Sequence, residues 1–219
     1  MSDAFLDFKK AYTAANEILY SSKSIISFPF SPKKLIKEKS GIACRSYEKA
    51  LQYGVDIHDF GSDSATIFKY HGKEIIFYDQ TKPEPHINFS LLHEFGHHYL
   101  KHGLNEKRND VYGKYEIETN FFSAQLLMPE QILRECIKRG AALSYSFLQQ
   151  KFGVSREAAE KRMSTLARTE SAWRSRQEKE FDDVILLKYS AFIDSICPKS
   201  TYFDYEYEEE MQSKRKSWY

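Results

Sequence analysis

The sequence has few cysteines, no long apolar run and almost no net charge, and each absence excludes a class of protein. Its 219 residues include only three cysteines, Cys44, Cys136 and Cys197, which are odd in number and far apart. This usage fits neither a disulfide framework nor a CxxC metal site, and it favours buried thiols in a reducing cytoplasm. No apolar segment approaches the roughly 18 to 20 residues that a membrane-spanning helix needs, so we expect no membrane association.

Charge and composition narrow the choice further. Lys and Arg number 32 against 31 Asp and Glu, a formal net charge of +1, so no global field draws the protein onto nucleic acid or an anionic membrane. Met1 to Lys10 carries two aspartates and no apolar core, which does not resemble a secretory signal. With 42% hydrophobic residues the chain is typical of a soluble globular protein, either one large domain or a domain of about 130 residues with an appendage.

Hydrophobic spacing and capping residues predict an α+β fold that is mainly helical with a small β-sheet. Two β-rich runs, Ala65 to Tyr70 and Glu74 to Tyr78, flank His71-Gly72 and predict a hairpin. Helices are expected at Asp3 to Tyr20, Lys33 to Ser40, Leu91 to about Gly103, Lys114 to Leu127, Pro129 to Gly140, Tyr145 to Gln150 and Arg156 to Ala167.

The boundaries of the third helix rest on specific residues. Pro83 and Pro85 are expected to interrupt the chain, after which Ser90 can cap a helix that begins at Leu91. Gly103 is a suitable terminating residue. The polar stretch from Asn105 to Gly113 is then expected to be a loop.

This helix contains an HExxH motif, His93-Glu94-Phe95-Gly96-His97. Residues four apart on a helix differ by about 40° in azimuth, so the His93 and His97 imidazoles project from one face and can hold one zinc ion. Zinc lowers the pKa of a bound water to about 7, and Glu94 on the next flank can take the proton as the water attacks a carbonyl.

A catalytic zinc site normally uses three protein ligands and leaves the fourth position to water, so one ligand is missing. The metzincin pattern places a histidine six residues after the second ligand, but Gly103 is there. On a continuous helix His98 and His102 point about 140° and 180° away from His93. We therefore expect both to be structural or solvent-facing.

The helix predicted from Lys114 to Leu127 offers a better third ligand. Glu116, Asn120, Ala124 and Leu127 share one face, and a carboxylate on an otherwise buried face needs a partner. Glu116 as zinc ligand satisfies this requirement, and Asn120, one turn later, can hydrogen-bond a ligand histidine. Glu118 lies about 200° from Glu116 and is expected to be solvated or secondary.

The segments NFSLLHEFGHHYLKH and YEIETNFFSAQLLMP together resemble the ImmA/IrrE family of zinc metallopeptidases, in which an HExxH helix precedes a helix of the form ExEANxFAAxLLMP. The resemblance is dense from about Ile87 to Leu133 and weaker before it. Thr119 replaces the usual alanine, and Phe122-Ser123 replaces the usual small pair. Neither change removes a metal-binding residue or the base.

The resemblance implies a zincin-like, gluzincin-type core in a cytoplasmic protease of bacterial or phage origin. Members of this family cleave a helix-turn-helix repressor of the XRE type and so relieve repression in mobile-element induction or a stress response. The resemblance also implies an edge strand that holds an extended substrate by main-chain pairing. Either Ala65 to Tyr70 or Glu74 to Tyr78 can be that edge.

The second half of the chain leads to an expected division into three parts: a metallopeptidase domain over 1–140, a helix-turn-helix-like segment over 141–170 and a charged, aromatic extension over 171–219. In the middle part Ser155 can cap the second helix. That helix mixes Arg156, Lys161 and Arg162 with two glutamates, which weakens the case for phosphate contacts. A structural or partner-docking role is favoured over DNA binding.

Two alternatives to a protease remain at this stage. One is a DNA-binding regulator with a structural zinc, and the other is a protein-binding module with a non-catalytic zinc site. Catalysis is favoured because a structural site needs no base such as Glu94, and a closed site needs a fourth protein ligand, for which the sequence offers no convincing candidate. Zinc is the default metal, although Mn or Fe can occupy similar ligands.

Overall fold

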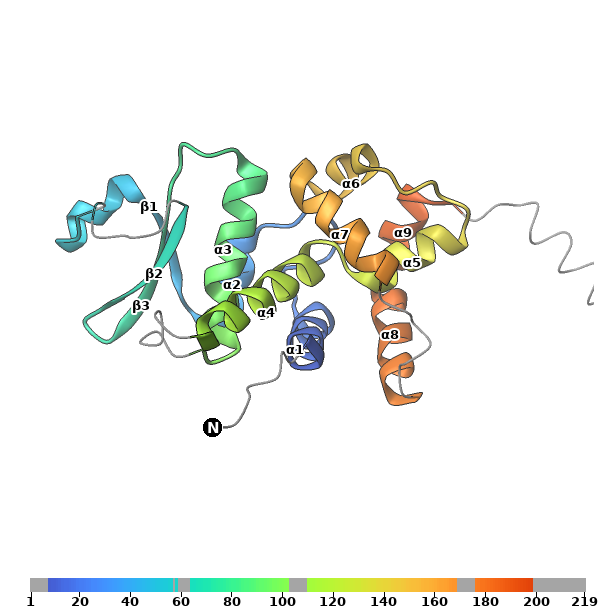
Figure 1. Cartoon of the computed structure of the whole chain (residues 1–219), viewed down its shortest axis with the longest axis horizontal. Helices are drawn as coiled ribbons and strands as arrows, with labels where there is room; N and C mark the ends of the chain where they lie inside the picture. The colour runs from blue at the N-terminus through green and yellow to red at the C-terminus, as the bar shows by residue number, and fades with distance from the viewer. Residues whose placement is uncertain (1–7, 57, 59–63, 103–109, 169–175, 199–219) are drawn as a thin grey trace, which may run out of the picture.

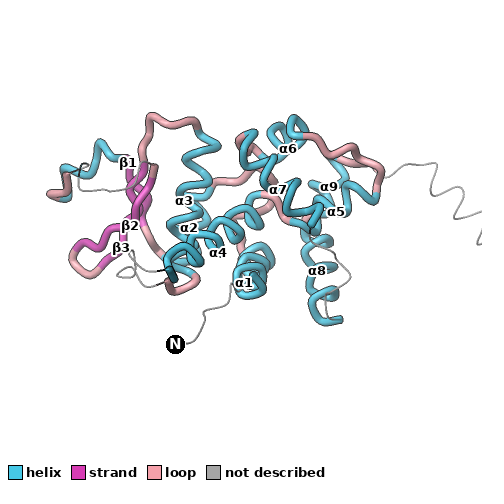
Figure 2. Tube along the Cα trace, viewed as in Figure 1, coloured by secondary structure: helices cyan, strands magenta, loops and turns pink. Residues whose placement is uncertain are grey.

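The computed structural model describes residues 8–56, 58, 64–102, 110–168 and 176–198. One end of the molecule carries the sheet and the rest is helical (Figures 1 and 2). The α+β expectation is therefore confirmed. In chain order the elements are α1 Phe8–Ser21, α2 Pro32–Ser40, β1 Ala43–Ser46, the 3-10 helix η1 Tyr47–Tyr53, β2 Ala65–Tyr70, β3 Lys73–Tyr78, α3 Glu84–Tyr99, α4 Asp110–Leu127, α5 Glu130–Lys138, α6 Tyr145–Phe152, α7 Arg156–Arg168, α8 Arg176–Lys188 and α9 Ser190–Ile196.

The sheet has the strand order β1-β3-β2. The predicted hairpin is present: β2 pairs antiparallel with β3, and β1 adds a parallel strand on the other side. Alternate residues of β3 face opposite ways, because Ile76 joins the main core that includes α3, whereas Ile75 and Phe77 join a small cluster with η1. Strand β3 is thus central, and β2 is an edge of the sheet as described.

Helix α3 differs from the prediction at both ends. It begins at Glu84, seven residues before Leu91, because Pro85 occupies the first turn, where no backbone N–H is needed. It ends at Tyr99 instead of continuing to Gly103, because Lys101 adopts a left-handed conformation with φ of 59°. The chain therefore reverses direction before His102.

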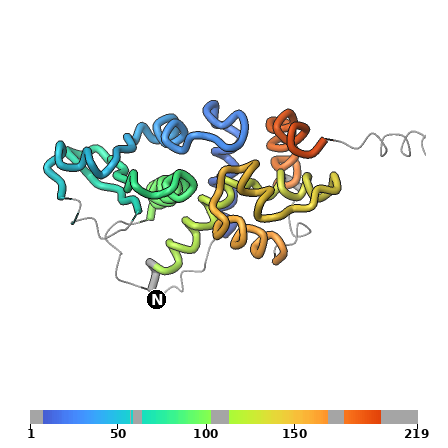
Figure 3. The backbone as a smooth tube through the Cα atoms, turned by 90° about the horizontal axis from the view of Figure 1, so that it is seen from above, coloured from blue at the N-terminus to red at the C-terminus, as the bar shows by residue number. Residues whose placement is uncertain are grey.

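Helix α4 lies in the middle of the molecule, between α3 and the later helices, as the view from above shows (Figure 3). It begins at Asp110, so residues 110–113 of the expected loop are helical. Two of the further helices, α8 and α9, lie in the region 171–219, where sequence patterns predicted only a charged extension. The predicted stretches 1–7 and 199–219 lie outside the described residues.

One hydrophobic core crosses the boundary predicted at residue 140. It joins residues of α1 and α3 to residues of α6, α8 and α9, among them Leu19, Phe95, Phe152 and Tyr189. Cys136 and Cys197 are buried free thiols in this core and Cys44 is partly buried. The division into three parts stays a prediction, but the helices after residue 140 are packed onto the same core as the HExxH helix. In the described residues, no helix has the length and apolar character of a membrane span.

A buried hydrogen-bond network also ties these helices together. Gln125 of α4 donates to Asn16 of α1 at 2.9 Å, and Gln131 of α5 donates to Asp182 of α8 at 2.7 Å. Arg162 of α7, only 2% exposed, donates to the Gln125 side chain and, at 2.9 Å, to the Met128 carbonyl. We call Asn16, Gln125, Gln131, Arg162 and Asp182 the helix network.

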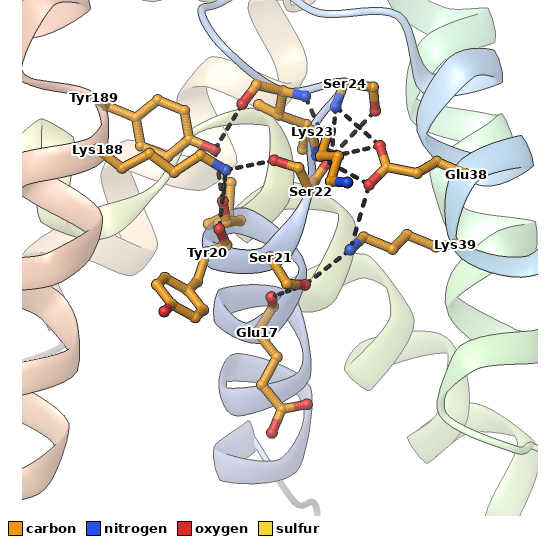
Figure 4. A network of polar contacts seen from close by, with 12 residues as sticks. Glu17, Tyr20, Ser21, Ser22, Lys23, Ser24, Glu38, Lys39, Lys188 and Tyr189 are labelled. Atoms are coloured by element: carbon orange, nitrogen blue, oxygen red, sulfur yellow. Dashed lines mark hydrogen bonds and ion pairs between the residues drawn. The ribbon is translucent and has the colours of Figure 1, made fainter.

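The C-terminal end of α1 is held from two sides (Figure 4). Lys188 of α8 donates to the carbonyls of Leu19 at 2.6 Å and Ser22 at 2.7 Å, which satisfies carbonyl groups left free at the helix end. Glu38 of α2 accepts from the backbone N–H groups of Lys23 and Ser24, both at 2.9 Å. These contacts fix α1 between α2 and α8.

Candidate metal centre

The two histidines of the HExxH motif lie together on α3, facing α4. Their Nε2 atoms are 3.1 Å apart. Residues His93 and His97 are four positions apart on a regular helix, so this convergence follows from the helical repeat. His97 is buried, with 8% of its surface exposed, and His93 is partly buried.

Glu116 completes the cluster from α4. Its Oε2 atom lies 3.1 Å from Nε2 of His93, and its Oε1 atom lies 3.1 Å from Nε2 of His97. Tetrahedral ligands at 2.0 to 2.1 Å from a zinc ion are about 3.3 to 3.4 Å from one another, so the observed spacing suits one small cation after a slight expansion. In the part of the chain that the structure describes, these three residues are the group of metal-ligand type that converges on a point. We call them the metal cluster.

The cluster is open on one side. The Glu116 side chain is 31% exposed, and Asn120, one turn further along α4, is exposed. The face of α4 expected to be mostly buried therefore borders solvent at its polar end. An open position beside three ligands is the arrangement of a catalytic rather than a structural zinc site.

Asn120 contacts His93, one of the two histidines of the metal cluster. Its Oδ1 atom is 3.1 Å from Nδ1 of His93. An amide oxygen can only accept, so Nδ1 of His93 carries the hydrogen and Nε2 keeps its lone pair toward the cluster. Burial acts to lower the pKa of His93, but the hydrogen bond and charge of Glu116 outweigh it and raise that pKa.

The Glu94 side chain extends from α3 to the sheet. Its Oε2 atom accepts a hydrogen bond of 3.0 Å from the backbone N–H of Ile67 in β2. It is not among the three residues of the metal cluster. The catalytic candidate is thus attached to the edge strand.

The register of the hairpin explains why this N–H is accessible. His71 and Gly72, with φ of 45° and 77°, form a two-residue turn between Tyr70 and Lys73. The closing pair of such a turn is hydrogen-bonded and the pairs then alternate, so the polar backbone groups of Ile67 point away from β3. They point to the outer edge of β2 in the described sheet, where the Ile67 N–H is bound by Glu94.

Gly96 allows the close approach of α3 and α4. A Cβ atom at this position would lie 2.8 Å from Cγ2 of Thr119 and 3.0 Å from Cδ1 of Phe122. Both neighbours are fully buried, so neither has room to withdraw. The glycine of this HExxH motif therefore sets the helix spacing on which the contacts with Glu116 depend.

His98 and His102 were expected to be structural or solvent-facing, and neither belongs to the metal cluster. His98 is partly exposed and its Nδ1 lies 2.6 Å from Oε2 of Glu74 on β3, in line with a structural role. His102, however, is buried beside His97, because α3 is not continuous to Gly103. Glu118, expected to be solvated or secondary, is buried with 6% exposure and contacts His102. Sequence periodicity did not predict the contact between His102 and Glu118, because it depends on Lys101, a residue other than glycine in the left-handed conformation.

The three cations considered for DNA contacts on α7 have other partners. Arg156 pairs with Glu160 at 2.9 Å, Lys161 pairs with Glu157 at 2.7 Å, and Arg162 is buried in the helix network. Arg162 is therefore not exposed for phosphate contacts. Ser155 does cap the helix, accepting from the Ala158 N–H at 3.1 Å.

Comparison with known families gives the same picture as the geometry. The profile of the IrrE N-terminal-like domain, peptidase family M78, matches residues 50–164, more than half of the chain. The chain belongs to this family. It is therefore a metallopeptidase of the IrrE/ImmA kind, and the matched region runs from η1 through the HExxH helix into α7. No curated protein sequence matches the chain significantly.

Proposed function

We propose that this metallopeptidase is a zinc-dependent endopeptidase with His93, His97 and Glu116 as metal ligands and Glu94 as general base. The observation that carries the proposal is the convergence of three residues, whose two Nε2 atoms and two carboxylate oxygens make contacts of 3.1 Å, beside a carboxylate that is not among them. When bound, zinc would supply Lewis-acid chemistry that acidifies a water and polarises a carbonyl.

The residues of the chain divide the remaining work. Glu94 takes a proton from the attacking water and passes it to the leaving amine, and its bond to the Ile67 N–H fixes where its carboxylate lies. Asn120 holds the His93 ring in the orientation that presents Nε2. The open side next to Glu116 leaves room for the scissile bond.

The substrate in this proposal is a protein segment in extended form. Strand β2 supports it, because it is an outer strand of the described sheet, lies next to Glu94 and offers backbone groups other than the Ile67 N–H for pairing. By resemblance to the family, we propose an XRE-type helix-turn-helix repressor, whose cleavage derepresses mobile-element or stress-response genes in the cytoplasm. The helices after residue 140 serve as structure or a docking surface, and direct DNA binding is the less favoured alternative.

The test compares new protein N-termini in cells that express the wild type or Glu94→Gln, with and without DNA damage. We expect a cut in a helix-turn-helix repressor that disappears in Glu94→Gln, a loss of at least about 100-fold in cleavage. Glu74→Gln, a matched substitution of a glutamate that pairs with His98 outside the metal cluster, should leave the cut in place.

Two results would contradict parts of the proposal. A fully active Glu94→Gln protein would refute the general-base mechanism. If no Glu94-dependent terminus appears while the purified protein holds one metal ion, a regulator or binding module becomes the better interpretation. In that case salt-dependent DNA binding that is lost in Arg156→Ala would favour the regulator.

A further inference from the structure

The turn at the end of α3 brings His102 against His97, the second histidine of the HExxH motif. The Lys101 N–H donates to the carbonyl of His98 at 3.1 Å, and the His102 N–H donates to the carbonyl of His97 at 3.0 Å. With Lys101 left-handed at φ of 59°, these bonds form a Schellman motif at the end of the helix. In this motif the final residue packs against the residue five positions earlier. Those two residues are His102 and His97.

Their side chains continue into a chain of hydrogen bonds that ends at a carboxylate. Nδ1 of His102 is 3.2 Å from Nδ1 of His97, and Nε2 of His102 is 3.2 Å from Oε2 of Glu118. An ionised carboxylate only accepts, so Nε2 of His102 carries the hydrogen. In a neutral imidazole the other nitrogen then accepts, and Nδ1 of His97 must donate to it.

The surroundings hold this chain in one arrangement. His102 is 7% exposed and Glu118 is 6% exposed, and the Tyr115 ring stacks on His102 at 4.1 Å with an interplanar angle of 11°. Thr119, 3.3 Å from Nδ1 of His102, donates its hydroxyl hydrogen to the Tyr115 carbonyl at 2.6 Å.

We propose that His102 and Glu118 are positioning residues that lock His97 in the tautomer with a free Nε2 lone pair and so raise its affinity for the metal. The inference rests on the proposed function of the His93, His97 and Glu116 cluster. The two ligand histidines are then oriented differently, since His93 has the neutral, exposed Asn120 whereas His97 has a buried relay to a carboxylate. A carboxylate at the end of the relay makes His97 the more basic ligand.

The test measures zinc affinity of the full chain by competition with a chelator of known affinity. His102→Phe keeps a ring to stack on Tyr115 but removes the acceptor, and we expect it to lower zinc affinity by about 10- to 100-fold. Glu118→Gln keeps an acceptor and loses the charge, so a smaller loss of about 10-fold or less is expected.

The controls come from the other side of the same helix. His98→Phe and Glu74→Gln make the same substitutions in a histidine–glutamate pair that touches α3 and β3 but not the metal cluster. Both should bind zinc within about twofold of the wild type. Circular dichroism and thermal unfolding of the metal-free proteins identify any variant that has simply lost its fold. If His102→Phe does not fold, Glu118→Gln tests the proposal in its place.

A spectroscopic measurement separates orientation from mere stability. With Co²⁺ in place of zinc, His102→Phe and Glu118→Gln should shift the visible ligand-field bands, because the His97 ring and its donor strength change, whereas the two control variants should not. Unchanged zinc affinity and unchanged bands in a folded His102→Phe protein would overturn the relay. If the wild type itself binds no metal, it is the proposed function that fails.

Discussion

Helix α4 carries a polar cluster in each of its halves, and the two differ in how their groups meet. Glu116 in the first half joins the metal cluster, where two Nε2 atoms and two carboxylate oxygens approach one another at 3.1 Å. Gln125 in the second half joins the helix network, where it donates to Asn16 and accepts from Arg162. The first is a convergence of electron-pair donors, and the second is a set of donor–acceptor pairs.

The difference separates a site from a structural contact. Groups that all present lone pairs to one point need a cation or protons between them, and their arrangement is costly without one. Groups that pair donor to acceptor are satisfied by the fold itself and rigidify it. On this criterion α4 links a metal centre to a scaffold, and substitutions in the two clusters should have opposite consequences.

The largest expected effect is on metal binding in Glu116→Gln. The amide keeps the shape of the side chain but lacks the charge, so zinc affinity should fall by more than about 100-fold, beyond the losses typical of indirect contacts. While the histidines are neutral, thermal stability of the metal-free protein should be equal or higher, because the amide nitrogen can donate to a histidine nitrogen where the carboxylate only accepts. Isothermal titration and calorimetric unfolding measure the two quantities, and retained zinc affinity would contradict the ligand assignment.

The converse is expected for Arg162→Met in the helix network. Removal of the guanidinium leaves the Met128 carbonyl and the Gln125 oxygen without this donor in a buried place, and unfolding free energy should fall by about 3 kcal/mol. Zinc affinity should stay within about twofold of the wild type. Urea denaturation checks the first statement. A variant of normal stability would show that Arg162 does not hold the helices together.

A third substitution tests the spacing between α3 and α4, the two helices that supply the metal cluster. In Gly96→Ala the new methyl meets Thr119 and Phe122, so stability should fall by about 1 to 3 kcal/mol and zinc affinity should fall with it as α3 moves from α4. Adding Thr119→Ala removes the closer of the two clashes and should restore part of both losses. An unaltered single variant would mean that the helices can separate without disturbing the site.

The smallest expected effect concerns a third polar cluster, the largely exposed one at the end of α1 (Figure 4). Burial of Glu38 acts to raise its pKa, but hydrogen bonds from Ser24, Lys23 and Ser22 outweigh it and lower the pKa from 4.5 to about 2. The stabilisation is therefore complete above pH 4.5 and is lost as pH falls toward 2. Glu38→Gln should flatten that part of the curve of stability against pH, and an identical curve would exclude Glu38 as the titrating group.

A structural feature could be predicted from the sequence where it follows from local periodicity. The spacing of His93 and His97 and the hairpin around His71-Gly72 follow from helical and strand repeats, and both occur as expected. Glu116 and Asn120 share one face of α4 because four residues make about one turn, and the packing of α4 on α3 brings that face to the histidines. Local repeats alone give the shared faces, whereas the contact between the two helices depends on tertiary packing.

The features that sequence patterns missed depend on the rest of the fold. Lys101 takes a conformation usually left to glycine, and only this brings His102 to His97. The burial of Glu118 depends on that reversal, and the burial of Arg162 depends on α4 and α5 packing against α7. The start of α3 was predicted too late, because proline interrupts a helix interior but is tolerated in a first turn, where Pro85 lies.

The most direct measurement is a crystal structure of the zinc-loaded protein with anomalous data collected on both sides of the zinc absorption edge. The account predicts one zinc peak, about 2.0 to 2.2 Å from Nε2 of His93, Nε2 of His97 and an oxygen of Glu116, with a water as the remaining ligand. Glu94 should reach that water without touching the ion. A zinc peak elsewhere, or a fourth protein ligand that closes the site, would contradict a catalytic metal centre at this place.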